Sequence, residues 1–314
     1  DIRGAVRTLR EHHILSATCA QVCPTCRLCV QGCARTGLDE PIRIAELQAF
    51  LADYERREDV HVLQAPPPGE RRVAVIGSGP AGLSAAAALA MKGYAVVVHE
   101  KMPHAGGLLR YGIPEHRLST ELLDHEINLI RGLGVRFECG RAIEGRAGLE
   151  GLLEQGFDAV FVALGCDQVY GLDIPGKKLI GIFLWDAFLA LSKEERGRRK
   201  LRTAVKGKRV VVVGGGSVAM DCAVTAKRLG AARVYAVSLE ALEELPADAD
   251  EKTLAFHEGV RFKPNCRVTG IGGKNGRVQA VRGVEIRGKK PGRFVPDNAV
   301  DIAGSSFTLP ADVV

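Results

Sequence analysis

Five of the nine cysteines lie between Cys19 and Cys33, a density that is typical of a metal or cluster site. Within this stretch Cys23, Cys26, Cys29 and Cys33 have the C-x2-C-x2-C-x3-C spacing of bacterial iron–sulfur sites. Soft thiolates favour an iron–sulfur cluster or zinc over hard cations. Zinc is the first alternative, although zinc sites more often use two separated C-x2-C pairs. The second alternative is a set of buried cysteines that bind no metal.

A glycine-rich turn follows an apolar, β-branched run at residues 73–76, which predicts a buried parallel strand. Gly77, Gly79 and Gly82 have the G-x-G-x-x-G spacing of dinucleotide sites. The first glycine permits the tight turn, the second lets the backbone approach a pyrophosphate, and the third lets the next helix pack closely. The following strand ends at Glu100, whose carboxylate can accept hydrogen bonds from ribose hydroxyls. The alternative is a tight turn that binds no ligand.

The same pattern occurs again from residue 209. A valine run is followed by a second glycine turn and helix, and residues 234–237 predict the second strand of this fold. Two dinucleotide folds in one chain imply two dinucleotides, which we expect to be a tightly held flavin and an exchanging nicotinamide. The predicted NAD(P)-binding residues of this turn are Gly214, Gly216, Ser217, Val218 and Ala219.

The composition is that of a globular protein with two or three domains, at 314 residues, 46% hydrophobic and 25% charged. No apolar run approaches the ~18 residues that a membrane span needs. The net charge of +6 with only 5% aromatic residues gives little support to a nucleic-acid partner.

Basic runs at 193–202 and 206–209 are interpreted as a solvated helix end or, alternatively, as a docking patch for an acidic partner. Cysteines without a secretory leader predict a reducing, cytoplasmic compartment.

The order of motifs resembles the glutamate synthase small-subunit family of flavoproteins. This family includes the N-terminal half of dihydropyrimidine dehydrogenase and the large subunit of electron-bifurcating ferredoxin:NADP oxidoreductases. The motifs are the cysteine-rich helical segment, GSGPAG, GGLLRYGIPEHRLS, DAVFVALG, LDIPG and GGGSVAMDCAVTAKRLGA. The resemblance implies an α/β fold with two nested Rossmann-like dinucleotide-binding domains preceded by a helical iron–sulfur domain. It also implies FAD in the first fold, NAD(P)H in the second and two 4Fe–4S clusters.

The resemblance assigns roles to particular residues. Cys23 and Cys29 correspond to ligands of the cluster nearer the flavin, and Gln48 to a glutamine ligand of that cluster; a surface glutamine on an amphipathic helix is the alternative. Cys33 would then bind the other cluster. Cys26 has no role in the family, so it separates this assignment from the ferredoxin-type spacing, which makes all four cysteines ligands. The implied FAD contacts are Gly77, Gly79, Pro80, Ala81, Gly82, Glu100, Lys101, Gly107, Leu108 and Arg117.

We expect three domains: residues 1–64 for the clusters, 65–178 plus 299–314 for FAD, and 179–298 for NAD(P)H. Residues 157–165 predict another buried strand. Four further cluster cysteines of the family would lie upstream, and family members continue beyond residue 314. The chain is therefore expected to be incomplete at both ends.

The residues after the second strand of the nicotinamide fold indicate which nucleotide is used. Family members that use NADPH carry two basic residues there, whereas this chain has Ser238, Leu239 and Glu240. A carboxylate repels a 2′-phosphate and can bond a free 2′-hydroxyl, which favours NADH. Ala219 instead favours NADPH, because alanine at the third position of the turn is often seen with that nucleotide. Charge beside a phosphate should outweigh a methyl group, so NADH is preferred.

The predicted activity is an oxidoreductase that takes hydride from NADH onto FAD and passes single electrons through 4Fe–4S clusters to a partner domain or subunit. The partner is part of a larger complex, and a ferredoxin is one candidate. One alternative is an electron-transfer scaffold whose nicotinamide site is idle. The other is a ferredoxin:NAD(P) oxidoreductase that runs in reverse or bifurcates electrons. No catalytic acid or base is identified.

Overall fold

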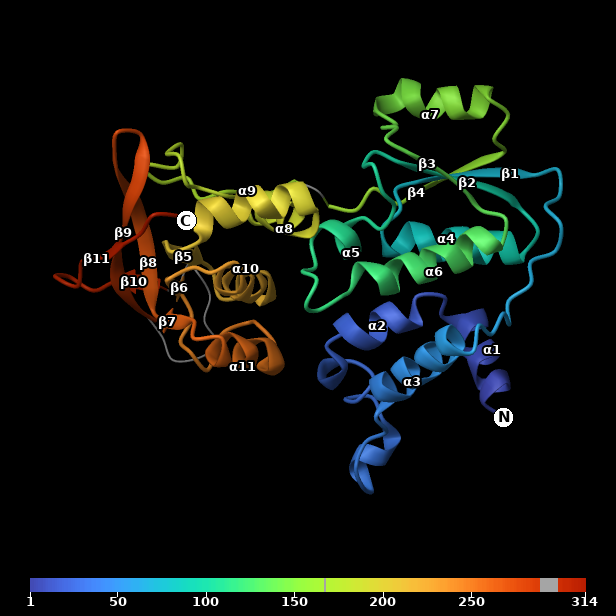
Figure 1. Cartoon of the computed structure of the whole chain (residues 1–314), viewed down its shortest axis with the longest axis horizontal. Helices are drawn as coiled ribbons and strands as arrows, with labels where there is room; N and C mark the ends of the chain where they lie inside the picture. Colours follow the sequence, from blue (N-terminus) through green and yellow to red (C-terminus); the bar gives the residue numbers. More distant parts are fainter. Residues whose placement is uncertain (167, 289–298) are drawn as a thin grey trace. The chain divides into compact units, whose positions relative to one another are not determined.

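The computed structural model describes residues 1–166, 168–288 and 299–314, and it divides into two compact units, residues 1–167 and 168–314 (Figure 1). The predicted division into three domains stays a prediction. The helical segment 1–64 shares a unit with the first dinucleotide fold, and residues 168–178 fall in the second unit. Residues 299–314 also lie in the second unit because their strands pair there.

The first unit contains a parallel sheet with strand order β3-β2-β1-β4. Alternate residues of its strands face opposite layers, because side chains alternate along a strand. Val75 and Val98 pack with α4 and α6, whereas Ala74 and Val97 pack toward α7. Figure 1 shows α7 on one side of the sheet and α4 and α6 on the other. The elements are β1 (Arg72–Ile76), α4 (Pro80–Met91), β2 (Ala95–Glu100), α5 (Leu108–Tyr111), α6 (Thr120–Gly132), β3 (Arg136–Cys139), α7 (Gly145–Glu154) and β4 (Ala159–Val162).

The strand predicted at 157–165 forms as β4, but the prediction that it is buried is wrong. Phe157 is 6% exposed, whereas Phe161 is 43% and Val162 is 55% exposed. Among the described residues β4 pairs with β1 alone, so it is the edge strand of this sheet. Apolar sequence cannot distinguish an edge strand from a central one.

The N-terminal segment is helical, as predicted. Helix α2 contacts α3 and α6, and α1 contacts α3, so the segment packs on the helical layer below the sheet (Figure 1). Two single-turn 3-10 helices follow α2: η1 contains Cys26, and η2 begins directly after Cys33. The elements are α1 (Ile2–His12), α2 (Ser16–Val22), η1 (Thr25–Arg27), η2 (Ala34–Gly37) and α3 (Ile44–Arg57).

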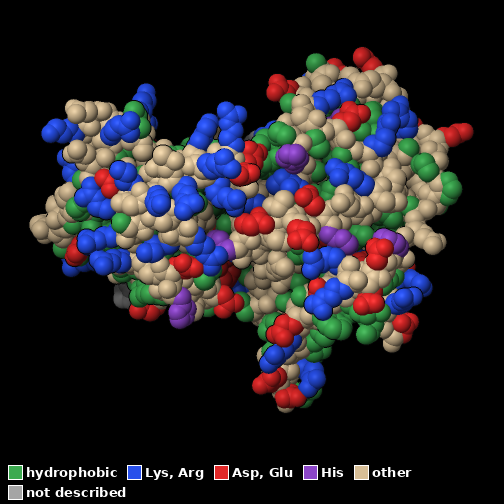
Figure 2. Space-filling view, in the orientation of Figure 1, with side chains coloured by type: hydrophobic (Ala, Val, Ile, Leu, Met, Phe, Trp, Pro, Cys, Tyr) green, Lys and Arg blue, Asp and Glu red, His purple; other side chains and the backbone are tan. Residues whose placement is uncertain are grey.

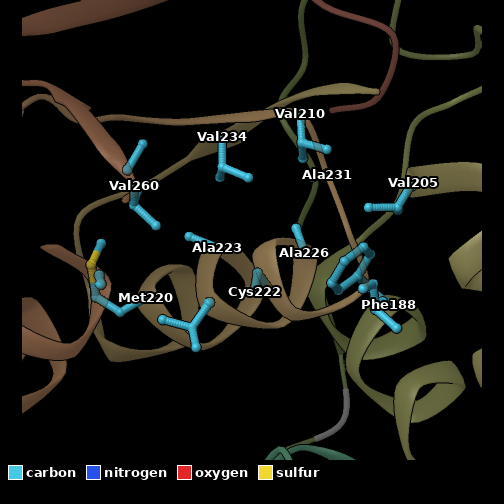
Figure 3. Close-up of a cluster of buried hydrophobic side chains, with 14 of the residues drawn as sticks. Phe188, Val205, Val210, Met220, Cys222, Ala223, Ala226, Ala231, Val234 and Val260 are labelled. Carbon is cyan, nitrogen blue, oxygen red and sulfur yellow. The ribbon is translucent and has the colours of Figure 1, made fainter. Parts of the chain in front are cut away.

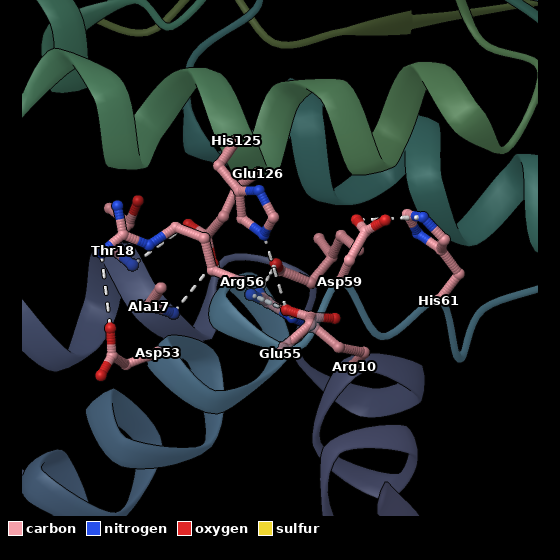
Figure 4. A network of polar contacts seen from close by, with 11 residues as sticks. Arg10, Ala17, Thr18, Asp53, Glu55, Arg56, Asp59, His61, His125 and Glu126 are labelled. Atoms are coloured by element: carbon pink, nitrogen blue, oxygen red, sulfur yellow. Dashed lines mark hydrogen bonds and ion pairs between the residues drawn. The ribbon is translucent and has the colours of Figure 1, made fainter.

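A buried charged network fastens these helices to α6 (Figure 4). Arg10 is fully buried; its Nη1 donates to Glu126 Oε1 over 2.5 Å and its Nε donates to Glu55 Oε2 over 2.8 Å. Glu126 also accepts from the backbone N–H groups of Ala17 (2.8 Å) and Thr18 (3.1 Å) in the first turn of α2. A carboxylate from α6 thus satisfies the otherwise unpaired N–H groups of α2. The network fixes the helix that leads into the cysteine run.

The second unit combines a parallel sheet in the order β5-β6-β7 with an antiparallel sheet formed by β8 to β11. Helices α8, α10 and α11 contribute apolar side chains to the core beside β5 and β6 (Figure 3). No helix in the described parts of the chain is both long and apolar enough to cross a bilayer. The elements are α8 (Trp185–Lys193), α9 (Glu195–Val205), β5 (Arg209–Val213), α10 (Ser217–Arg228), β6 (Arg233–Val237), α11 (Ala249–His257), β7 (Arg261–Lys263), β8 (Cys266–Lys274), β9 (Arg277–Gly288), β10 (Ala299–Asp301) and β11 (Phe307–Pro310).

Candidate cofactor-binding sites

The first glycine turn connects β1 to α4, and the surroundings of its three glycines differ. Gly77 has φ +97°, and a Cβ there would lie 2.3 Å from the carbonyl oxygen of Ala163. A Cβ on Gly82 would lie 1.9 Å from the carbonyl oxygen of Gly77. A Cβ on Gly79 would meet nothing within 4 Å. Gly77 and Gly82 are therefore fixed by packing, whereas Gly79 leaves open space where α4 begins.

This open space suits an anionic group. Gly79 caps α4, and Pro80 and Ala81 begin the helix. A helix N-terminus offers free backbone N–H groups and a partial positive charge to a phosphate. The turn therefore offers the space and the N–H donors that a pyrophosphate requires, and its contact with a dinucleotide stays a prediction.

Glu100 ends β2 and ties the turn to its neighbours. Its buried carboxylate accepts from the backbone N–H of Ser78 (2.9 Å), from the Ser78 hydroxyl, and from the backbone N–H of Met102 (2.8 Å). The Ser78 hydroxyl in turn accepts from the backbone N–H of Gly106 (3.0 Å). An ionised carboxylate offers about four acceptor positions, so Glu100 retains capacity for a ribose hydroxyl. Ser78 and Met102 were not identified from the sequence, where only the glycine and acid positions follow a pattern.

The segment Gly106–Gly107 lies directly against the turn. A Cβ on Gly107, at φ +52°, would lie 2.7 Å from the Cα of Gly79. The structure thus brings Gly77, Gly79, Gly82, Glu100 and Gly107 together.

Three further predicted FAD contacts lie on the segments around this turn. Lys101 is exposed directly after Glu100, Leu108 is exposed at the start of α5, and Arg117 is half-buried between α5 and α6. Their contact with FAD stays a prediction.

The second glycine turn has the same construction. Gly214 has φ +143°, and a Cβ on Gly216 would meet nothing within 4 Å, which leaves space at the start of α10. Ser217, Val218 and Ala219 form the first turn of that helix. A cavity of about 820 Å³ adjoins the turn and is lined by Gly214, Gly216, Val218 and Ala219 together with largely apolar side chains of the second unit.

Glu240 lies over the middle glycine of this turn. A Cβ on Gly215 would lie 2.9 Å from Glu240 Oε2. The backbone carbonyl of Glu240 accepts from the Ser238 hydroxyl (3.1 Å) and from the backbone N–H of Asn265 (3.1 Å), which holds the loop after β6 in place. Ser238 and Asn265 are therefore positioning residues. The sequence marked Ser238 only as a position without a basic side chain, and it did not indicate Asn265, which lies outside the glycine motif.

The cysteine run does not form one closed site. Cys23 directly follows α2, Cys26 lies in η1, Cys29 lies in the following turn, and Cys33 precedes η2. Within the described residues, no three His, Cys, Asp or Glu side chains meet at a single metal site. The side chains of the four cysteines therefore do not come together in the structure, although their spacing is that of a ferredoxin-type site. Gln48 is half-buried on α3, and its role as a ligand stays a prediction.

Two cysteines of the run have contrasting surroundings. Burial, together with the neighbouring Cys23, raises the pKa of the Cys19 thiol to about 12, and His13 Nε2 lies 3.2 Å from its Sγ. Cys33 accepts hydrogen bonds from backbone N–H groups, chiefly that of Ile42, and these lower the pKa of its thiol. A stabilised thiolate suits a cluster ligand. Cys33 therefore fits such a role in this structure, but the described residues supply no complete ligand set.

Comparison with known proteins identifies the family. A model described as pyridine nucleotide-disulphide oxidoreductase matches residues 71–304, which is most of the chain. The chain belongs to this family. A second model, described as dihydropyrimidine dehydrogenase domain II with a 4Fe-4S cluster, matches residues 1–60. The matched families imply FAD, a nicotinamide cofactor and 4Fe–4S clusters, so these cofactor predictions are confirmed at the level of the family.

Individual relatives support the same placement. The NAD-dependent dihydropyrimidine dehydrogenase subunit PreT of Escherichia coli is 39% identical over 263 residues, covering 83% of this chain and 61% of PreT. The glutamate synthase [NADPH] small chain of the same species is 32% identical over 320 residues, covering 99% of this chain and 67% of that protein. The chain thus spans about two thirds or less of the length of these relatives. The predicted resemblance to the glutamate synthase small-subunit family is confirmed.

Solved structures agree on the fold. FprA from Mycobacterium tuberculosis has a TM-score of 0.61 at 19% identity, covering 79% of this chain and 70% of that chain. A thioredoxin reductase from Lactococcus lactis has a TM-score of 0.56 at 20% identity, with coverage of 78% and 76%. These likenesses confirm the predicted α/β class with Rossmann-like parallel sheets.

Proposed function

We propose that this chain is the flavin- and nicotinamide-binding part of an NADH-dependent oxidoreductase that delivers electrons to a partner domain or subunit of a larger complex. The support is the pair of open glycine turns, each at the start of a helix and each followed by a strand that leads to a carboxylate. When bound, FAD supplies the conversion between two-electron nicotinamide chemistry and one-electron acceptors. No step is assigned to the cluster, because the described residues supply no complete ligand set for it.

In this proposal the chain itself positions both nucleotides. The N-terminus of α4 binds the FAD pyrophosphate beside Gly79, and Glu100 accepts a ribose hydroxyl. The N-terminus of α10 binds the pyrophosphate of the nicotinamide nucleotide beside Gly216. Neither Gly79 nor Gly216 has a side chain at the proposed phosphate position, so backbone N–H groups can reach the phosphates.

The position of the Glu240 carboxylate is the observation that supports NADH over NADPH as the nucleotide. Its carboxylate lies beside Gly215, on the side of the turn where the ribose of a bound nucleotide lies in dinucleotide folds. A 2′-phosphate there would meet a negative charge, whereas a 2′-hydroxyl could donate a hydrogen bond to it. PreT, described as NAD-dependent, is also 39% identical to this chain. The NADPH-linked relative at 32% identity shows that the family includes both specificities.

Steady-state kinetics of the full-length protein with an artificial acceptor tests this choice. We expect Glu240→Gln to lower kcat/KM for NADH by about tenfold or more, because one hydrogen bond to a charged group is weakened. The value for NADPH should rise, since a repulsive charge is removed. Glu243→Gln, an exposed acid in the same loop, is the matched control and should change neither value. Equal effects of the two substitutions would contradict the assignment.

The proposal also places the protein in the cytoplasm. None of the nine cysteines, all of which lie in the described residues, forms a disulfide in the structure. Thiols persist in a reducing compartment, whereas secreted proteins pair them. Cell fractionation with an antibody against the full-length protein would check this placement.

A further inference from the structure

The surface of α9 carries most of the net charge of the chain. Residues 194–208 contain seven Arg or Lys and two Glu, a net charge of +5, while the whole chain has +6. All seven cations are exposed. Figure 2 shows Lys and Arg side chains gathered over the part of the second unit where Figure 1 draws α9. This basic surface consists of Arg196, Arg198, Arg199, Lys200 and Arg202 on α9, with Lys206 and Lys208 directly after it.

The basic surface lies on a firmly packed helix. Gly197, Leu201 and Val205 recur every four residues and are buried. A Cβ on Gly197 would lie 2.6 Å from the carbonyl oxygen of Leu191, so α9 packs closely on α8. The face of α9 formed by Gly197, Leu201 and Val205 thus packs into the core. The cations lie on the exposed face of this packed helix.

The charges are largely uncompensated. Within the described residues, Arg199 pairs with Glu195, and no ion pair forms at the other six cations. Arg196 and Lys200 are four residues apart, as are Arg198 and Arg202, and like charges at this spacing destabilise a helix. The segment therefore does not gain helix stability from this pattern. Negative charge supplied from outside would relieve the repulsion.

The composition of the surface favours an acidic protein over other anionic partners. Residues 194–208 contain no aromatic side chain on which a base could stack. Leu201 and Val205 of α9 are buried and Ala204 packs half-buried against the core, which leaves no exposed apolar residue of α9 to enter a lipid surface. Four of the seven cations are arginine, whose fork-shaped guanidinium pairs with carboxylates through two hydrogen bonds.

We propose that the basic surface of α9 docks an acidic electron-carrier protein. This inference rests on the proposed function, which requires electrons to pass to a protein partner. Long-range attraction between opposite charges speeds such encounters and aligns the two proteins. The basic surface thus predicts that the partner is acidic, a property that the cofactor sites alone do not indicate.

Binding of an acidic plant-type ferredoxin to the full-length protein tests the proposal. Isothermal titration calorimetry would compare the wild type with the triple variant Arg198→Glu/Lys200→Glu/Arg202→Glu. The matched control is Lys274→Glu/Arg277→Glu/Arg282→Glu, three exposed cations of the β8–β9 hairpin with the same change of charge. We expect the α9 variant to weaken binding by roughly tenfold or more at low salt, and the control far less. Added salt should weaken binding to the wild type.

Several results would overturn the docking proposal: no ferredoxin binding at low salt, equal effects of the two variants, or tighter binding of a DNA duplex that the α9 variant abolishes. Reduction of the flavin by NADH without any carrier is measured in parallel. Its failure in the wild type would contradict the proposed function. Its persistence in both variants, with unequal ferredoxin binding, would support docking independently of the nicotinamide site.

Discussion

The backbone N–H of Ser78 donates to Glu100 Oε2 over 2.9 Å, so the first glycine turn and the end of the next strand form one hydrogen-bonded unit. The Ser78 hydroxyl extends this unit to Gly106. In the proposed FAD site, this unit would hold the pyrophosphate and ribose positions at a fixed separation before any nucleotide binds. Such preorganisation lowers the cost of ordering the site during binding.

Two alanine substitutions in this turn should have different effects. Gly82→Ala places a Cβ 1.9 Å from the Gly77 carbonyl oxygen, and overpacking of this kind costs about 1–3 kcal/mol or more. Gly79→Ala meets no protein atom within 4 Å, so we expect the stability of the apoprotein to be unchanged while FAD affinity falls. Thermal unfolding of apoprotein and FAD titration would measure the two effects. Equal destabilisation by both changes would contradict the assigned roles.

The buried network of Arg10 should contribute strongly to stability. Arg10→Met leaves Glu126 without its cation in a fully buried site and leaves Glu55 with His125, whose Nε2 lies 3.7 Å from its Oε2. Breaking a buried pair of this kind costs about 3–5 kcal/mol. The exposed pair between Arg56 and Glu121 is the comparison, and Arg56→Ala should cost about 1 kcal/mol or less. Urea unfolding of the full-length protein gives both values. A small loss for Arg10→Met would show that the network is not needed to hold the helices on α6.

Local sequence patterns predicted the parts of the fold that depend on local chemistry. The glycine turns, the helix after each and the acid at the end of β2 all form as expected, because their geometry is set within a few residues. The Arg10 network was not predicted, since an arginine in an amphipathic helix looks like a surface residue until α6 supplies Glu126. The position of residues 307–310 was also missed, because their pairing with β9 is set by tertiary contacts.

The role of Cys26 separates the two cluster assignments. Cys26 is exposed in η1, and the family resemblance gives it no ligand role. We therefore expect Cys26→Ser to leave the iron and sulfide content of the full-length protein unchanged, whereas Cys33→Ser should lower both. Metal analysis and the cluster absorbance would decide. Iron loss in Cys26→Ser equal to that in Cys33→Ser would favour the ferredoxin-type assignment.

The ion pair between Arg209 and Asp312 should make stability depend on acid pH. The hydrogen bond from Arg209 lowers the pKa of Asp312 below its ordinary value of 3.8. The stabilisation is thus fully present above that value and is lost as pH falls through the lower pKa of the folded state. We expect the stability difference between wild type and Asp312→Asn to be constant near neutral pH and to shrink as pH falls below about 4. Thermal unfolding across this range measures it, and a difference that grows on acidification would be the opposite of this expectation.

An anaerobic titration of the full-length protein with NADH and, separately, with NADPH tests the central claim most directly. The flavin absorbance would be followed in both titrations at equal nucleotide concentrations. The account predicts prompt bleaching by NADH and little by NADPH, because Glu240 lies where the 2′-substituent of the ribose must fit. Bleaching by NADPH alone would contradict the role of Glu240, and bleaching by neither would contradict the proposed oxidoreductase function.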